Sequence, residues 1–201
     1  MTALTTPRHP LVVRALAEAN TWCFGHVIDD RPAYVHAVRV AATLVRHLPD
    51  ASPHLVAAVL LHDAPEFVPP DVDLDRVLTA TYGPEVPRII RALQVEHHAL
   101  DEPDPPINTG DRPVLLASTA DKIVALTSLL RRAREAAAGQ DAFFAARPAL
   151  LRLLPHFHAF HEAGAGLVPA SMSEGLRTIL TLMDRATESA RQATAFRAAA
   201  P

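Results

Sequence analysis

Cysteine and lysine are almost absent from this sequence. Its 201 residues include one cysteine, Cys23, and its 19 basic residues include one lysine, Lys122. A single cysteine excludes a disulfide within the chain, and the neighbours Trp22 and Phe24 favour a small buried side chain over a nucleophile. No stretch is typical of a signal peptide or of a membrane span of about 18 apolar residues, so we expect a cytoplasmic protein.

A surplus of positive charge is also missing. The 19 basic residues are balanced by 22 acidic ones, which gives a formal net charge of −3. Proteins that bind nucleic acid or a membrane surface usually carry a basic footprint, so we expect neither partner. A small phosphorylated substrate needs only a local basic cluster. The sequence does not indicate an oligomeric state.

Strand-like alternation of apolar and polar residues is lacking too, whereas apolar residues recur throughout at helical spacing. The sequence therefore predicts an all-α, single-domain helical bundle. Proline, glycine and capping residues place expected helices at 10–22, 30–48, 53–63, 84–100 and 111–130. They also indicate a short helix that ends at 82 and two later helices that begin at 141 and at 171. We expect one domain over 1–201, with the core of the site at about 33–132 and the helices of 141–198 packed on it.

One stretch, LVAAVLLHDAPE, places an adjacent His62-Asp63 pair in an otherwise apolar helix. Ser52 and Pro53 suit the start of that helix, and Pro65 disfavours helical geometry just beyond the pair. The pair is therefore expected at a broken helix end. A buried, unpaired carboxylate costs several kcal/mol, so Asp63 needs an arginine, hydrogen bonds or a cation. A hydrogen bond between the two side chains is the simpler alternative.

A second carboxylate, Asp121, stands in an expected helix that is apolar nearly all round, so it too needs a partner. His36 lies in the first half of an earlier expected helix. Two imidazoles and two carboxylates form a set of potential ligands for a borderline or hard divalent cation: His36, His62, Asp63 and Asp121. Such a set leaves positions open for a water molecule and a phosphate oxygen.

Three segments carry these residues in order: HAVRVA at 36–41, LLHDAPE at 60–66 and STADKI at 118–123. Their order and separation resemble those of the HD-domain metal-dependent phosphohydrolases. The resemblance implies an all-helical HD-type fold in which one divalent cation, most often Mn²⁺, is held by His36, His62, Asp63 and Asp121. It also implies a catalytic role for Glu66, at the position of the family's HDxxE glutamate, where it could orient or deprotonate a water molecule.

The branches of that family differ in what they act on, and the sequence favours a hydrolase of phosphorylated nucleosides. The small alarmone hydrolases, which remove the 3′-pyrophosphate of guanosine tetra- and pentaphosphate, are similar in length, in HAVRVA and in the segment YGPEVPRIIRAL. The chain departs from them at Phe67, where they have the aspartate of a Glu-Asp pair, at Ala125, where they have asparagine, and in lacking their Arg-x-Ser before the first histidine. A 5′-deoxynucleotidase-like branch pairs the glutamate with an aspartate five residues later, which is Asp71 here. A non-catalytic nucleotide sensor on the same scaffold is a third hypothesis.

Contacts with the substrate phosphates are expected from basic side chains near the four ligands. Helical spacing puts Arg39 on the face of His36, and Lys122 follows Asp121. Arg88 is a third candidate, on a later helix. A group of histidines without a carboxylate or cysteine at ligand spacing is interpreted as an exposed or partly packed face: His156, His158 and His161.

Overall fold

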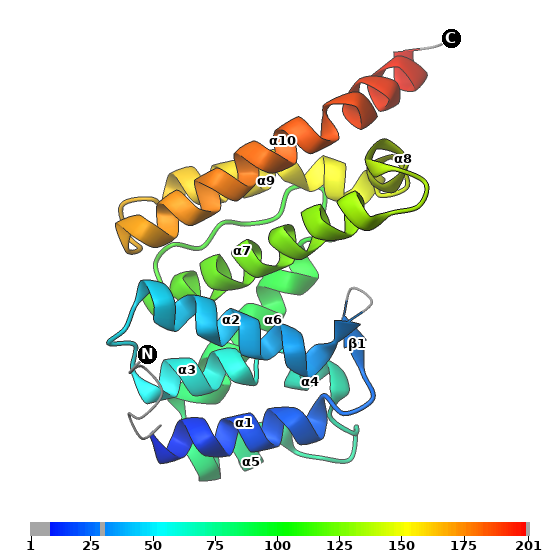
Figure 1. Ribbon diagram of the computed structural model, residues 1–201. Helices are drawn as coiled ribbons and strands as arrows, with labels where there is room; N and C mark the ends of the chain where they lie inside the picture. The colour runs from blue at the N-terminus through cyan, green and yellow to red at the C-terminus, as the bar shows by residue number, and fades with distance from the viewer. Residues whose placement is uncertain (1–8, 29–30, 200–201) are drawn as a thin grey trace, which may run out of the picture. The chain divides into compact units, whose positions relative to one another are not determined.

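The computed structural model describes residues 9–28 and 31–199, with side chains up to 192. Within those ranges the chain forms ten helices and one short two-stranded ladder (Figure 1). The all-α class predicted from the sequence is confirmed. The chain divides into two compact units, residues 1–98 and 99–201.

The described part of the first unit contains six helices: α1 (Pro10–Trp22), α2 (Ala33–His47), α3 (Pro53–Leu60), α4 (Ala64–Phe67), α5 (Leu74–Tyr82) and α6 (Glu85–Ala99). Ahead of α2, the strand β1 (Val27–Ile28) pairs with β2 (Arg31–Pro32) in antiparallel register. Arg31 and Pro32 fall in the helix expected over 30–48 but form a strand instead, so that part of the prediction is wrong. The next backbone N–H, that of Ala33, donates to His26 O at 3.0 Å, so the ladder holds the chain extended until α2 begins. Asp30, the first residue of the helix expected over 30–48, lies outside the described residues.

Helix α3 is buried from Leu55 to its end, and this fixes the position of the residues that follow it. All six residues from Leu55 to Leu60 are buried. The helix packs against both α1 and α2, and the three lie side by side in Figure 1. Small buried residues on the neighbours, among them Ala15 and Ala37, allow this close approach. Because each fully buried leucine contributes roughly 1.5–3 kcal/mol, the end of α3 is a rigid support for the next residues.

The predicted start of α3 is confirmed. Ser52 Oγ accepts a hydrogen bond from Leu55 N at 3.2 Å, and Pro53 is the first helical residue. The helix ends at Leu60, just before the predicted break, because Leu61 N already bonds in a tight turn to Ala58 O at 3.2 Å as well as to Ala57 O. Pro65 lies in the first turn of the separate helix α4, which the sequence did not predict.

Helix α5 begins and ends where its polar and glycine residues indicate. Asp73 Oδ1 accepts a hydrogen bond from Arg76 N at 3.0 Å and so caps the first turn. Gly83 ends the helix with φ of +78°, a conformation that side chains with a Cβ rarely adopt. The acidic turn before α5 thus contributes a helix cap through Asp73, while Asp71 is exposed.

The second unit consists of α7 (Arg112–Glu135), α8 (Gln140–Ala145), α9 (Pro148–Gly164) and α10 (Ala170–Ala199). Helix α10 packs along α7, α8 and α9, and Figure 1 shows it beside α7 and α9. The core between them is built from large apolar side chains, among them Leu115, Leu126, Leu130, Phe144, Leu154, Phe160, Leu176 and Met183. Asp111 caps α7 as predicted, through a 3.3 Å hydrogen bond from Val114 N. The helix runs beyond the predicted end at 130, and Pro155 is accommodated inside α9.

Helix α7 is also apolar enough, over one 18-residue window of mean hydropathy 1.4, to cross a membrane by length and composition. No such stretch was expected from the sequence. In the structure 56% of that window is buried inside the molecule, and the helix supplies Leu115, Leu126 and Leu130 to the core. This is the pattern of a core helix.

Candidate metal centre

His62 and Asp63 lie in the turn between α3 and α4, and both are buried. His62 Nδ1 is 2.8 Å from Val59 O, and because a carbonyl oxygen only accepts, Nδ1 carries the hydrogen. A neutral imidazole held in this way presents the lone pair of Nε2, the atom through which such histidines bind metals. That Nε2 lies 3.3 Å from Asp63 Oδ1. A proton on Nε2 or a cation shared between the two atoms would stabilise this approach.

Asp63 occupies the position that usually caps a helix, yet it makes no side-chain cap to α4. A capping aspartate would stabilise the helix by about 1 kcal/mol, and that stabilisation is given up here. The carboxylate instead lies among imidazoles, with Oδ2 3.9 Å from His36 Nε2. Within the part of the chain that the structure describes, Oδ2 is buried without a hydrogen bond. This is an atom that a metal ion would satisfy.

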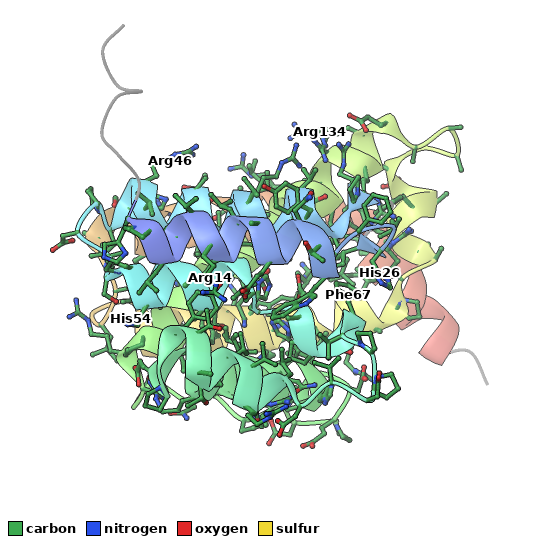
Figure 2. The ribbon with its side chains drawn as sticks, turned by 90° about the horizontal axis from the view of Figure 1, so that it is seen from below. Arg14, His26, Arg46, His54, Phe67 and Arg134 are labelled. Atoms are coloured by element: carbon green, nitrogen blue, oxygen red, sulfur yellow. The ribbon has the colours of Figure 1, made fainter. Side chains whose placement is uncertain are left out.

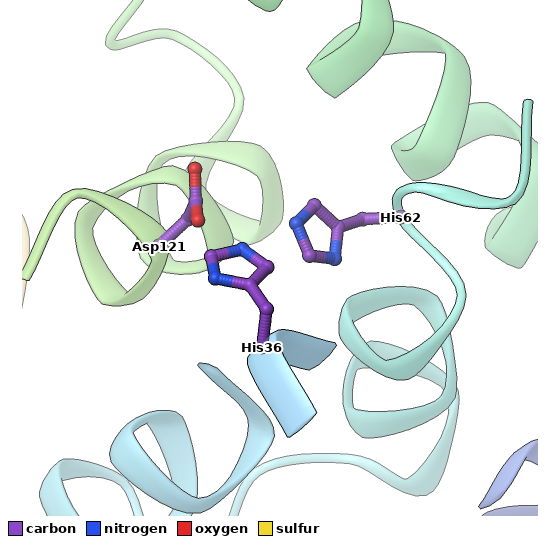
Figure 3. A group of neighbouring side chains, drawn as sticks. All are labelled: His36, His62 and Asp121. Atoms are coloured by element: carbon purple, nitrogen blue, oxygen red, sulfur yellow. The ribbon is translucent and has the colours of Figure 1, made fainter. Parts of the chain in front are cut away.

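His36 lies in the first half of α2, as predicted, and its ring is tilted by 45° to that of His62 with centroids 5.4 Å apart. His36, His62 and Asp121 form a group that could hold a metal ion. One ligand atom of each lies within 4.8 Å of the others, and Figure 3 shows the three side chains. Nitrogen and carboxylate oxygen donors in one group suit a borderline divalent cation.

Asp121 lies on α7, where the sequence predicted a buried carboxylate, but the structure leaves it half-buried. The buried charge on that turn is Lys122, which is 5% exposed. Its Nζ donates to Ser118 Oγ at 2.7 Å and lies 4.3 Å from the centre of the Phe160 ring. These contacts place the ammonium group between α7 and α9, and the contact of Lys122 with a substrate phosphate stays a prediction.

A further histidine, His97 of α6, belongs to this cluster and was missed by the sequence reading. Its ring meets that of His62 edge to face, with centroids 5.9 Å apart. Successive helical residues point about 100° apart, so His97 and His98 face different neighbours. The paired histidines in the sequence were a visible signal, but only the packing of α6 assigns one of them to His62.

Glu66, the expected catalytic residue, is held from α6 as well. Its Oε1 lies 3.3 Å from Gln94 Nε2 and 3.3 Å from His98 Nε2. Gln94 in turn accepts a 2.6 Å hydrogen bond from Arg91, whose Nε donates to Asp75 at 2.9 Å. Three residues one helical turn apart on α6 thus form a chain of contacts that orients the half-exposed Glu66 carboxylate.

The remaining candidates are on the surface. Asp71 and Arg39 are exposed. Arg88 is bonded to Glu85 of the same helix at 2.9 and 2.8 Å. A surface pair of this kind needs no functional explanation, because it is common on helices and contributes little to stability. Catalytic and phosphate-binding roles for these three residues remain predictions.

Cys23 is buried at the end of α1, as expected for a small apolar side chain. Burial and, to a smaller extent, the negative charge of Asp63 together raise the pKa of its thiol to about 11. A thiol with this pKa is protonated near neutral pH and is a poor nucleophile. Helix α1 packs against α4, which begins directly after the His-Asp pair.

The comparisons with known proteins bear on the fold. No family model matches the chain, and no curated protein matches it. A solved structure described as a metazoan ortholog of SpoT that hydrolyses ppGpp and plays a role in starvation responses has the same fold, with a TM-score of 0.63. The match is 16% identical and covers 89% of this chain and 98% of that one. The chain therefore has an all-α fold of the HD type.

Proposed function

We propose that this chain is a metal-dependent hydrolase of phosphorylated nucleosides. The observation that carries the proposal is the position of Asp63, a buried carboxylate that leaves its helix uncapped and lies among imidazoles. In the proposal one divalent cation, Mn²⁺ by preference, is held by His36, His62, Asp63 and Asp121. A cation there would offset charge on the phosphoryl oxygens and make a water molecule more acidic.

The protein's own contribution to the chemistry centres on Glu66. Gln94 and His98 both contact Oε1, so Oε2 is the oxygen that accepts the proton of the attacking water. The chain of contacts through Gln94 to Arg91 restricts the rotamers of the glutamate, which a general base requires for a productive geometry. His62 and Asp63, four and three residues before Glu66, are both buried.

The substrate proposed first is a guanosine tetra- or pentaphosphate, from which the 3′-pyrophosphate is removed. Support comes from the segment 82–93 and from the shared fold with a protein described as hydrolysing ppGpp. A 5′-deoxynucleotidase-like activity is the second candidate, and Phe67 and Asp71 favour it. Phe67 cannot act as an acid, and Asp71 stands at the spacing of the second carboxylate in that branch.

Product analysis separates the two activities. Metal-loaded protein is incubated with guanosine 5′-diphosphate 3′-diphosphate and, separately, with deoxynucleoside 5′-monophosphates. We expect pyrophosphate from the first substrate. Orthophosphate released from the monophosphates alone would assign the second activity, and no turnover of either substrate with several metals would favour a nucleotide sensor.

The same proposal concerns partners and location. The substrate is a small molecule, and neither nucleic acid nor a membrane is required, which is consistent with the net charge of −3. A hydrolase of soluble nucleotides would act in the cytoplasm.

A further inference from the structure

His26 and Phe67 form a stacked aromatic pair beside the candidate centre. Their ring centroids are 4.5 Å apart and the ring planes differ by 19°. Figure 2 labels both side chains, which lie together at one end of α1. Phe67 is half-buried, whereas His26 is exposed. One face of the imidazole therefore covers the phenyl ring, and the exposed imidazole still offers aromatic surface to solvent.

The backbone holds His26 firmly in this position. Its N–H donates to Cys23 O at 3.1 Å, and its carbonyl accepts from Ala33 N at 3.0 Å. Gly25, with φ of +76°, supplies the turn between α1 and β1 that brings the imidazole over Phe67. The backbone of His26 is held at both its N–H and its carbonyl, and its ring rests on a second ring. The side chain therefore loses little conformational entropy when a ligand stacks on it.

The pair is also close to the proposed phosphate chemistry. Phe67 is four residues after Asp63, which corresponds to a rise of about 6 Å along helix α4. On the other side, α1 ends four residues before His26 and packs against α4, the helix that carries Phe67. A nucleoside spans such a distance between its phosphate and its base.

We infer that His26, supported by Phe67, is a stacking platform for the nucleobase of the substrate. The inference rests on the proposed function, since it places the phosphate at the His-Asp pair. It gives Phe67 a role that an acid at this position could not fill. Aromatic rings accept any base on their π-face, so the platform selects nucleosides over other phosphate esters and does not select one base strongly.

The test is a ratio of affinities measured without turnover. Dissociation constants of guanosine 5′-monophosphate, adenosine 5′-monophosphate and ribose 5-phosphate are measured by calorimetry with manganese-loaded protein. The affinity ratio of nucleotide to ribose 5-phosphate cancels the phosphate contribution. We expect nucleotides to bind wild-type protein roughly tenfold more tightly than ribose 5-phosphate, and His26→Ala to reduce this ratio to about threefold or less.

Two further variants make the result specific. His26→Phe keeps an aromatic face and is expected to keep the ratio, whereas His54→Ala removes an exposed histidine at the start of α3 and is expected to change nothing. Figure 2 shows His54 at the opposite end of the view from His26. An unchanged ratio in His26→Ala, no preference for nucleotides in wild-type protein, or no measurable binding at all would overturn the inference. If the protein binds nucleotides but does not hydrolyse them, the hydrolase proposal fails, while the affinity ratio of nucleotide to ribose 5-phosphate still tests the stacking platform.

Discussion

Replacing Glu66 by glutamine is expected to lower kcat on the best substrate by about 100-fold or more, the usual scale for a positioned acid or base. The amide cannot accept a proton but has nearly the same shape, so the contacts of the side chain with Gln94 and His98 can persist in altered form. The manganese content should stay at the wild-type level because Glu66 is not among the proposed ligands. Steady-state kinetics and elemental analysis of the same preparation check both statements.

Two matched variants complete this experiment. Glu85→Gln removes an exposed carboxylate that pairs with Arg88 on α6, and it should leave kcat within about twofold. Asp71→Asn is expected to lower kcat on the scale of Glu66→Gln if the second activity is correct. Retention of most activity by Asp71→Asn, with loss in Glu66→Gln, would mean that Glu66 works without Asp71. Full activity in Glu66→Gln would contradict the proposed base.

His62→Ala is expected to remove metal binding and the stabilisation that the metal provides. A ligand at 100 times its dissociation constant stabilises a protein by about 2.7 kcal/mol, which for a chain of this size raises Tm by roughly 5 °C or more. Wild-type protein should show this rise with manganese, and His62→Ala should show none. Differential scanning calorimetry with and without manganese gives the shift independently of any loss of stability in the metal-free variant.

The control for that variant is His54→Ala. His54 is an exposed histidine of α3, the helix that supports His62. Its manganese-dependent rise in Tm should equal that of wild-type protein. A rise of the same size in His62→Ala would show that manganese binds elsewhere, and the assignment of the centre would then be wrong.

Helix boundaries could be predicted where one residue type determines the local conformation. Ser52 caps α3, Asp111 caps α7 and Gly83 ends α5, each by an interaction within a few residues. The ladder of β1 with β2 was missed because two-residue strands have no periodicity to detect. The helix α4 was missed because Pro65, taken as a terminator, also suits the first turn of a new helix.

The site could be predicted in part for the same reason. The His62-Asp63 pair was visible because polar residues interrupt an apolar run, and burial of both is confirmed. The contacts from α6 to His62 and Glu66 depend on packing between segments some 30 residues apart, which no local pattern encodes. Lys122, expected to contact phosphate because it follows Asp121, contacts Ser118 and Phe160, and its role toward a substrate stays a prediction.

Metal stoichiometry tests the account most directly. Purified protein is loaded with manganese, freed of excess metal by gel filtration, and analysed for manganese and protein in the same sample. The account predicts about one manganese per chain, held by a site in which Oδ2 of buried Asp63 has no hydrogen bond from any described residue. A content below about a tenth of a manganese per chain would contradict it.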